Sequence, residues 1–456
     1  MSCLNAKGDA LESSDTSVIL KKRLEWFQDL KFGLFIAFGP YNMWTGGDIP
    51  WILNTDPAGT DPHRGDRMSP NWDFDIKVLR NGYWNMNQGF YPRHFDAEQW
   101  AQIAKDAGMK YLVFYTKHHD GFNMYDTQLS DYKITSPDCP YSDHPNPDIT
   151  ARLCEAFRKE GFGIGFCHSY ADWHSPLYWN PNMPILNRHY NYDINKDPER
   201  WQKFVDFLHG QVRELMTGYG KVDILWLDGG WDKKDMQVEK MVEIARSHQP
   251  ELIVVSRGGN IHQDYKTPER RVPEKPLGEP WETWWTMGDN SGQKSWWVMG
   301  DNSTPELIHL LVDIVCKGGN LLLHALVNSD GTIISSCVER LKEMGEWMRV
   351  NGEAIYGTRM HTQYRDGNIC YTKKGNYVYA IYLDNPQDAS KPKGLPALVV
   401  IRHVKPAPGT KIHLLGVDEP VKWRLVNDAV EISIPNSVSK SLPCKYAYSF
   451  RIQINP

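Results

Sequence analysis

Short apolar runs alternate with amphipathic segments along most of this chain, from about Glu25 to Ile355. Runs that are apolar at consecutive positions predict strands buried on both faces of a sheet. The predicted strands are Phe32–Phe38, Tyr111–Tyr115, Gly163–Cys167, Val222–Leu227, Leu252–Val255 and Asn320–Leu326. The segments between them have the periodicity of helices. The predicted helices are Ala97–Ala107, Asp148–Lys159, Pro198–Thr217, Lys234–Ser247, Pro305–Cys316 and Ser336–Arg349.

This alternation predicts a parallel sheet, and with six or more repeats the α/β architecture that fits best is a (β/α)8-like barrel. After Tyr356 the pattern changes to short alternating runs separated by Pro and Gly, which predict a small all-β sandwich. These runs are Tyr377–Tyr382, Ala397–Arg402, Lys411–Leu415, Val430–Ile434 and Ala447–Ile454. We therefore expect a polar N-terminal tail over residues 1–20, a catalytic barrel domain over 21–355 and a C-terminal β-sandwich domain over 356–456.

Two stretches fit neither pattern. Thr45–Arg93 is long and rich in Gly, Pro, Asn and Trp, and Asp264–Gly300 is dense in Trp and acidic residues around Glu279–Asp289. Long loops in a compact domain are usually functional, and loops that follow barrel strands lie over the mouth of the barrel. Both stretches are therefore expected to build a site rather than the scaffold.

Bulk composition narrows the class of protein. The chain has 456 residues, a formal net charge of −5 and a pI near 6.4, which give no bias toward nucleic acid or anionic membranes. No apolar stretch is long enough for a transmembrane helix. The 18 Trp and 22 Tyr residues suit the apolar faces of sugar rings, although large aromatic core residues would give the same composition.

The cysteines and the N-terminus bear on the compartment. Eight cysteines without a CxxC pair indicate neither a disulfide scaffold nor a structural zinc site. The first residues are polar and lack the apolar core of a signal peptide. We expect an exported protein (periplasmic, secreted or lipid-anchored near Cys3) whose signal is absent from this chain. The alternative is an ordinary polar tail.

Polar residues follow the predicted strands at their carboxyl ends, where functional residues of such barrels gather. The candidates are His118 and His119 in KHHDGF, His168 and Trp173 after the third strand, Asp228 after the fourth, and Arg257 after the fifth. Asp228 directly ends an apolar strand, so it needs a partner, and the two glycines after it allow close approach of a ligand. An Asp that merely starts a turn is the alternative.

A metal or other cofactor is not expected. Adjacent residues on a strand point to opposite faces, so His118 and His119 would not bind one ion together, and no ligands with zinc-like spacing accompany them. Donors to sugar hydroxyls are the preferred interpretation. Arg257 would either bind substrate or hold a catalytic carboxylate.

Five ordered segments resemble glycoside hydrolase family 29, the α-L-fucosidases. They are KFGLFIAFG, FDAEQWAQIAKDAGMKYLVFYTKHHDGF, DILWLDG, GGNLLLHALVNSDG and WMRVNGEAIY, within residues 24–358. The resemblance implies a retaining exo-glycosidase that acts on oligosaccharides or polysaccharides, with Asp228 as nucleophile. It also implies that Trp226 lies near the sugar, that His118 and His119 hold ring hydroxyls, and that Arg257 lies beside the catalytic pair. The two catalytic carboxyl groups should be about 5–5.5 Å apart.

The acid/base residue varies in position within the family. Glu269, 12 residues after Arg257, fits one branch and is preferred here, whereas Glu282 in PWET fits others. Whichever carboxyl group acts should have a raised pKa, because it must donate a proton near neutral pH.

The sugar-recognition residues depart from the family pattern. The first strand ends in Ala37-Phe38-Gly39 where the family has His-Trp-Gly, and Cys167-His168-Ser169 replaces Tyr-Tyr-Ser. Only Pro50-Trp51 corresponds to the family's Glu-Trp-Tyr. Alternatives are therefore an α-L-galactosidase, acting on 6-substituted or sulfated L-galactose of algal galactans, or a carbohydrate-binding pseudoenzyme; a metal-dependent hydrolase ranks third. Basic candidates for a sulfate are Arg64, Arg67 and Arg93.

Overall fold

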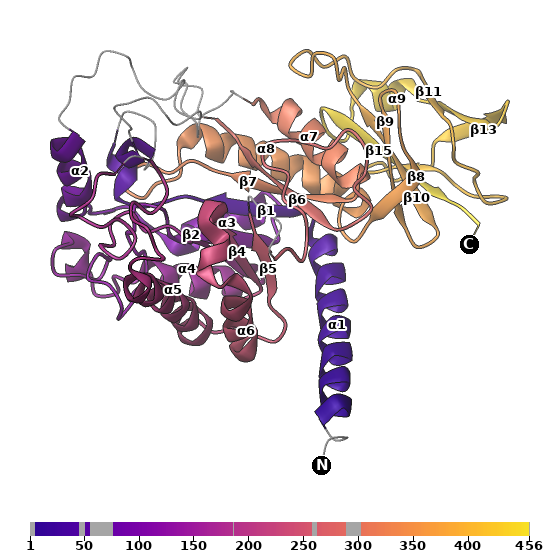
Figure 1. Cartoon of the computed structure of the whole chain (residues 1–456). Helices are drawn as coiled ribbons and strands as arrows, with labels where there is room; N and C mark the ends of the chain where they lie inside the picture. Colours follow the sequence, from indigo (N-terminus) through magenta and orange to yellow (C-terminus); the bar gives the residue numbers. More distant parts are fainter. Residues whose placement is uncertain are drawn as a thin grey trace.

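A parallel seven-stranded sheet forms the centre of the computed structural model (Figure 1), which describes residues 5–44, 51–54, 76–185, 187–257, 262–288 and 302–455. The sheet order is β5-β4-β3-β2-β1-β7-β6. The strands are β1 (Phe32–Ile36), β2 (Tyr111–Lys117), β3 (Gly163–Ser169), β4 (Ile224–Asp228), β5 (Ile253–Ser256), β6 (Trp281–Thr286) and β7 (Gly319–His324). The predicted parallel sheet of a (β/α)8-like domain is confirmed.

An irregular segment, residues 262–270, lies between the two edge strands. It pairs antiparallel with β5 through Val255 and Gln263, and parallel with β6 through Lys266 and Trp281. Further on, the Arg270 amide donates to the Trp284 carbonyl. Because both edges of the sheet are hydrogen-bonded to this segment, it takes the place of an eighth strand and carries Glu269 toward the carboxyl ends of the strands.

The strand β6 was not predicted. Its sequence WETWWT was included in the predicted loop Asp264–Gly300, because a glutamate sits among bulky tryptophans. In the structure Glu282 is fully buried and receives hydrogen bonds from buried tyrosines, so a charged residue type is accommodated inside the sheet.

Helices cover the outside of the sheet. One of them, α2 (Ile76–Trp84), was not predicted, because it falls within the stretch Thr45–Arg93 that was expected to be a loop. The other six lie at the predicted places and are α3 (Ala97–Asp106), α4 (Ile149–Lys159), α5 (Pro198–Gly218), α6 (Val238–His248), α7 (Thr304–Cys316) and α8 (Ser335–Asn351). Three of them begin directly after an aspartate, Asp96, Asp148 or Asp197, whose carboxylate accepts a backbone N–H of the first turn. Single side chains thus fix where these helices start.

Two side-chain layers separate at the strands. The inward-facing positions form a small core inside the barrel that includes Phe35, Tyr111, Cys167 and Trp226. The alternate positions pack against the helices in a larger cluster. Which layer a strand residue joins decides whether it can reach the site.

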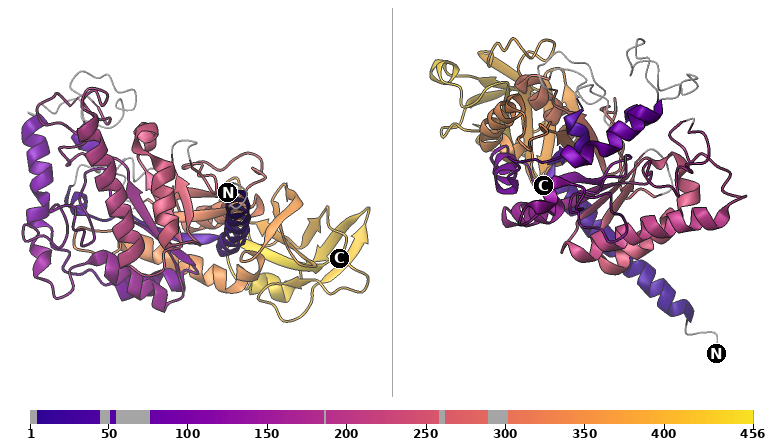
Figure 2. Two further views of the ribbon diagram at one scale, coloured as in Figure 1. Left: turned by 60° about the horizontal axis from the view of Figure 1, so that its bottom comes forward. Right: turned by 90° about the vertical axis from the view of Figure 1, so that its left-hand side faces the viewer.

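A long first helix, α1 (Asn5–Leu30), precedes β1 and projects from the body of the molecule (Figures 1 and 2). The sequence had predicted a polar tail up to residue 20, whereas the structure continues one helix through most of that stretch. At its end Phe27 is buried against the bottom of the barrel, and Arg23 binds Asp223 at 2.7 Å. No helix among the described residues is long and apolar enough to cross a membrane.

The C-terminal part forms two antiparallel sheets, which lie at one end of the molecule (Figure 2). The orders are β12-β15-β10-β9-β8 and β11-β14-β13. The strands are β8 (Arg359–Asp366), β9 (Ile369–Lys374), β10 (Tyr377–Leu383), β11 (Leu398–Ile401), β12 (His413–Leu414), β13 (Lys422–Val426), β14 (Ala429–Ser433) and β15 (Ala447–Gln453), with a short α9 (Asn436–Lys440). One apolar core joins the two sheets, as expected of a sandwich. We propose that the catalytic domain ends near residue 355, before β8.

Candidate active site

Asp228 is the last residue of β4 and lies at the carboxyl ends of the strands. Its side chain is buried and receives hydrogen bonds from the Tyr115 hydroxyl, from Arg257 at 3.0 Å and from the Gly229 amide at 2.8 Å. Gly229 has φ +76°, and a Cβ there would come within 2.9 Å of His119. The chain therefore needs glycine directly after the carboxylate.

Arg257 joins two carboxylates. It follows β5, and its guanidinium binds Asp228 through one nitrogen and Glu269 through another. Glu269 is partly exposed, with a side-chain exposure of 28%. Asp228 and Glu269, the preferred candidate pair of carboxylates, thus share one cation.

The local charges keep Asp228 ionised. Burial alone would raise its pKa, but the Arg257 guanidinium, the neighbouring histidines and the Tyr115 hydroxyl hold the pKa of this carboxyl below its usual range. An ionised carboxylate at this position can act as a nucleophile near neutral pH.

Glu282 lies at the other end of the barrel. It is the second residue of β6 and is level with Asn320 near the start of β7, whereas Asp228 ends its strand. The Tyr111 hydroxyl donates to it at 2.6 Å and the Tyr265 hydroxyl at 3.2 Å. Burial raises the pKa of Glu282 to about 7. The raised pKa matches the expectation for an acid/base group, but the position does not, because the structure does not bring Glu282 to Asp228.

The two histidines lie side by side, with ring centroids 4.2 Å apart. The expectation that they point to opposite faces is wrong, because β2 ends at Lys117 after a bulge and both residues belong to the following turn. His119 Nε2 is 3.7 Å from the Asp228 carboxylate. Both side chains therefore reach the site.

Hydrogen bonds assign different roles to the two rings. The His119 amide donates to His118 Nδ1, so the proton of the neutral His118 ring is on Nε2, which is a donor. The Ser169 hydroxyl donates to the Ala171 carbonyl, so His119 Nδ1 donates to the Ser169 oxygen and Nε2 accepts. Burial lowers the pKa of His119 to about 4, and it also holds the pKa of His118 well below its usual range. Both rings are therefore neutral, with a donor N–H at His118 Nε2 and an acceptor nitrogen at His119 Nε2.

The side chains of His119, Asp228 and His118 also place one potential ligand atom each within 4.8 Å of one another. Both oxygens of the Asp228 carboxylate already have partners, since Arg257 binds Oδ1 and the Tyr115 hydroxyl donates to Oδ2. A second such group, Asp313, Cys316 and Cys370, lies where α7 meets β9, and there Lys317 and Arg365 already bind Asp313.

His168 does not join the site, and its predicted role in binding substrate is corrected here. Its neighbour Cys167 faces the inside of the barrel, so His168 faces the helices. There its Nδ1 lies 2.9 Å from the Thr116 hydroxyl, and its ring packs near Tyr125. Trp226 was expected to lie near the sugar. It faces the inside of the barrel and is buried below Asp228, in contact with Phe35 and under Arg257. It forms part of the floor of the site.

Three tryptophans form an aromatic wall beside His119. Trp51 and Trp173 had been predicted from the sequence, and Trp231, two residues after Gly229, had not. Their ring centroids lie 5.5, 5.3 and 5.0 Å from the His119 ring. A wall of indole rings beside a buried carboxylate suits the apolar face of a sugar ring.

Sequence reasoning missed other residues at the strand ends. His324 ends β7, lies inside the barrel beside Trp284 and Phe35, and is buried. It is level with Phe35, two residues before Ala37, on the neighbouring strand. Its place as the last residue of an apolar strand is the signal that could have found it. Arg93 is exposed, whereas Arg64, Arg67 and Pro50 lie outside the described residues.

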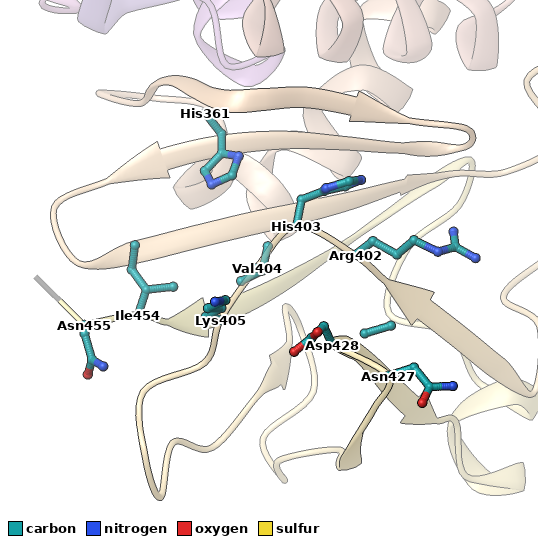
Figure 3. A pocket seen from close by; sticks show the side chains of 10 residues that line it. His361, Arg402, His403, Val404, Lys405, Asn427, Asp428, Ile454 and Asn455 are labelled. Carbon is teal, nitrogen blue, oxygen red and sulfur yellow. The ribbon is translucent and has the colours of Figure 1, made fainter.

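A separate cavity of about 720 Å³ lies in the C-terminal domain (Figure 3). His361, Arg402, His403, Lys405 and Asp428 contribute to its lining. Asp366 already binds Arg402 at 3.3 Å and faces His403 at 3.8 Å. The cavity contains no tryptophan and none of the candidate catalytic residues.

Comparison with known protein families gives two matches. The model described as Alpha-L-fucosidase matches residues 3–353, and the model described as Alpha-L-fucosidase C-terminal domain matches residues 363–453. Among curated proteins, the chain is 28% identical over 450 residues to tissue alpha-L-fucosidase of Mus musculus, covering 94% of this chain and 91% of that protein. It is 26% identical over 450 residues to alpha-L-fucosidase of Branchiostoma floridae, covering 94% and 92%.

Solved structures show the same fold. Alpha-L-fucosidase isoenzyme 1 from Paenibacillus thiaminolyticus superposes with a TM-score of 0.74 at 27% identity, over 96% of this chain and 100% of that one. The Thermotoga maritima alpha-fucosidase solved in complex with fucose gives 0.70 at 28% identity, over 93% and 96%.

Proposed function

The chain belongs to the α-L-fucosidase family, glycoside hydrolase family 29, and from that membership we infer that it is a retaining exo-α-L-glycosidase that removes terminal α-L-fucosyl residues from glycans. We propose Asp228 as the nucleophile and Glu269 as the acid/base residue. The observation that supports this assignment is the single guanidinium of Arg257 that binds both carboxylates at the carboxyl ends of the strands.

The reaction follows from this pair. An Asp228 oxygen attacks the anomeric carbon while the glycosidic C–O bond breaks, and Glu269 gives its proton to the leaving oxygen. Water then attacks the glycosyl-enzyme from the opposite side, Glu269 takes a proton from that water, and the Asp228 carboxylate leaves. The net inversion at each step restores the original anomeric configuration.

Glu269 is favoured over Glu282 for a geometric reason. A general acid must reach the leaving oxygen within hydrogen-bond distance, and Glu282 is sealed at the amino end of the sheet by Tyr111 and Tyr265. The partial exposure of Glu269 leaves room for an aglycone and for water. The raised pKa of Glu282 comes from burial and needs no role in catalysis.

The neighbouring residues would orient the sugar. His118 Nε2 would donate to one ring hydroxyl and His119 Nε2 would accept from another, while the wall formed by Trp51, Trp173 and Trp231 covers the apolar face. Arg257 would hold the nucleophile and would bind the Glu269 carboxylate once its proton has passed to the leaving oxygen. The hydrogen-bond directions described above support the roles of the two histidines.

The relatives do not favour an α-L-galactosidase or a pseudoenzyme, since the curated proteins and the solved structures described above are all fucosidases. We propose that the enzyme works outside the cytoplasm, where glycans with terminal fucose occur.

Product analysis with azide tests the two carboxylates separately. Asp228→Ala with 4-nitrophenyl α-L-fucoside should be inactive and should form the inverted β-L-fucosyl azide when azide replaces the nucleophile. Glu269→Ala should form the retained α-L-fucosyl azide, because azide then attacks the glycosyl-enzyme without needing a general base. Glu282→Gln is the matched control and should give fucose alone.

Either azide product from the Glu282 variant would contradict the assignment. A second arm compares 4-nitrophenyl α-L-fucoside with the corresponding α-L-galactoside in the unmodified enzyme. Faster release from the fucoside supports the proposed substrate, and faster release from the galactoside would refute it.

A further inference from the structure

Arg188 lies at the mouth of the site on a loop whose backbone is held by aromatic donors. Its carbonyl accepts hydrogen bonds from Trp173 Nε1 at 3.1 Å, from the Tyr178 hydroxyl at 2.9 Å and from Trp231 Nε1 at 3.2 Å. Three donors on one carbonyl fix the position of this backbone, so the fold determines where the Arg188 side chain begins.

The guanidinium of Arg188 lies over the aromatic wall next to the nucleophile. Its Cζ is 5.1 Å from the centre of the Trp231 ring, which in turn is 5.0 Å from the His119 ring. His119 Nε2 is 3.7 Å from the Asp228 carboxylate. Burial is the main reason why the pKa of His119 is low, and the charge of Arg188 contributes to lowering it. A positive charge is therefore placed close to where the sugar would bind.

Arg188 differs from the other arginines around the site in its ion pairs among the described residues. Within the part of the chain that the structure describes, no carboxylate forms an ion pair with Arg188, whereas Arg257 binds two and Arg200 binds Asp197. Arg188 is partly buried, so it is only partly solvated by water. A cation in this state gains from an anionic ligand more than a fully exposed one does.

We propose that Arg188 is a subsite for an anionic group, a sulfate ester or a carboxylate, on the glycan from which the terminal α-L-fucosyl residue is removed. The inference rests on the proposed function. The planar fork of the guanidinium matches both anions through paired N–H···O bonds. Trp231 beneath it holds the fork in place through its ring face.

The test compares anionic and neutral substrates. The first set is 4-nitrophenyl α-L-fucoside and its 2-, 3- and 4-O-sulfated forms, which place the anion on the fucosyl ring. The second set is α-L-fucose linked to glucuronic acid or to glucose, which places a carboxylate on the neighbouring sugar. We expect Arg188→Gln to lower the ratio of kcat/KM for an anionic substrate over its neutral counterpart at least tenfold. The control Arg200→Gln, on a cation that already has a carboxylate partner, should leave the ratio unchanged.

The outcomes separate the two proposals. If the unmodified enzyme cleaves no α-L-fucoside at all, the proposed function fails. If it cleaves the neutral fucoside but prefers no anionic substrate, or if Arg188→Gln leaves the ratio unchanged, the anionic subsite is overturned. Titration of Asp228→Asn with each sulfated fucoside, with and without Arg188→Gln, measures the subsite independently of turnover. At least tenfold weaker binding in the double variant is expected, and equal binding would overturn the proposal.

Discussion

Replacing Glu282 by glutamine would change how the stability of the protein depends on pH. The carboxyl group is fully buried at the amino end of the barrel, and burial raises its pKa from an ordinary value of 4.5 to about 7. Below about pH 4.5 the group is neutral in both the folded and the unfolded chain. Above about pH 7 it is ionised in both, and the buried charge then destabilises the folded protein.

The magnitude follows from the difference in pKa. A difference of about 2.5 corresponds to about 3 kcal/mol, since one pH unit corresponds to about 1.4 kcal/mol. The favourable contribution of the neutral carboxyl group is thus complete below about pH 4.5 and is lost as the pH rises through about 7. Glutamine keeps the shape and cannot ionise, so Glu282→Gln should gain up to about 3 kcal/mol relative to the unmodified protein between pH 4.5 and 8.

Urea unfolding followed by tryptophan fluorescence at several pH values measures this difference. The matched control is Glu279→Gln, a substitution at an exposed neighbouring position. Its free energy of unfolding should differ from that of the unmodified protein by the same amount at every pH. Turnover of 4-nitrophenyl α-L-fucoside by Glu282→Gln should stay within about threefold, because the residue does not reach Asp228. A difference in stability that is flat with pH, or a loss of turnover beyond about 100-fold, would refute the placement of Glu282 as a buried structural acid.

Three further substitutions probe the site and its surroundings. Tyr115→Phe removes a hydrogen bond to the ionised Asp228 that is worth about 1.5–3 kcal/mol. The acidic limb of the plot of kcat/KM against pH should therefore move up by about 1–2 pH units. An acidic limb at the same pH as in the unmodified enzyme would contradict this contact. Arg257→Lys keeps one positive charge but not the fork that joins two carboxylates. We expect kcat/KM to fall by about 10–100-fold, which corresponds to about 1.4 kcal/mol for each factor of ten. Unchanged kinetics would argue against the bridge between the carboxylates. His168→Gln should lower the free energy of unfolding by about 1–3 kcal/mol and leave KM within twofold of that of the unmodified enzyme. A large rise in KM would show that His168 contacts the substrate.

The sequence predicted most elements of the barrel because burial on both faces gives continuous apolar runs. Residues such as those of β1 and β4 are apolar at nearly every position, and Asp96, Asp148 and Asp197 mark helix starts chemically. The strand β6 was not predicted because Glu282 interrupts its apolar run. The hydrogen-bond partners that allow this glutamate to be buried are Tyr111 and Tyr265, which lie outside the local sequence pattern of the strand.

The same apolar continuity hid the direction of the side chains. When every position of β3 is buried, the sequence does not tell which alternate set faces inward, so His168 was assigned to the site although it faces the helices. The bulge in β2 and the early end of that strand place His118 and His119 together, against the simple alternation expected for a strand.

By itself, the sequence determined the repeating strand–helix order, the all-β C-terminal part and Asp228 as the acidic end of an apolar strand, because these depend on local patterns and on single residue types. Only the tertiary structure decided that Glu269 and Asp228 share Arg257 while Glu282 lies at the opposite end. The physical reason is that strand pairing and the irregular closing segment set the height of each carboxylate in the barrel. Such contacts join residues that no local pattern relates.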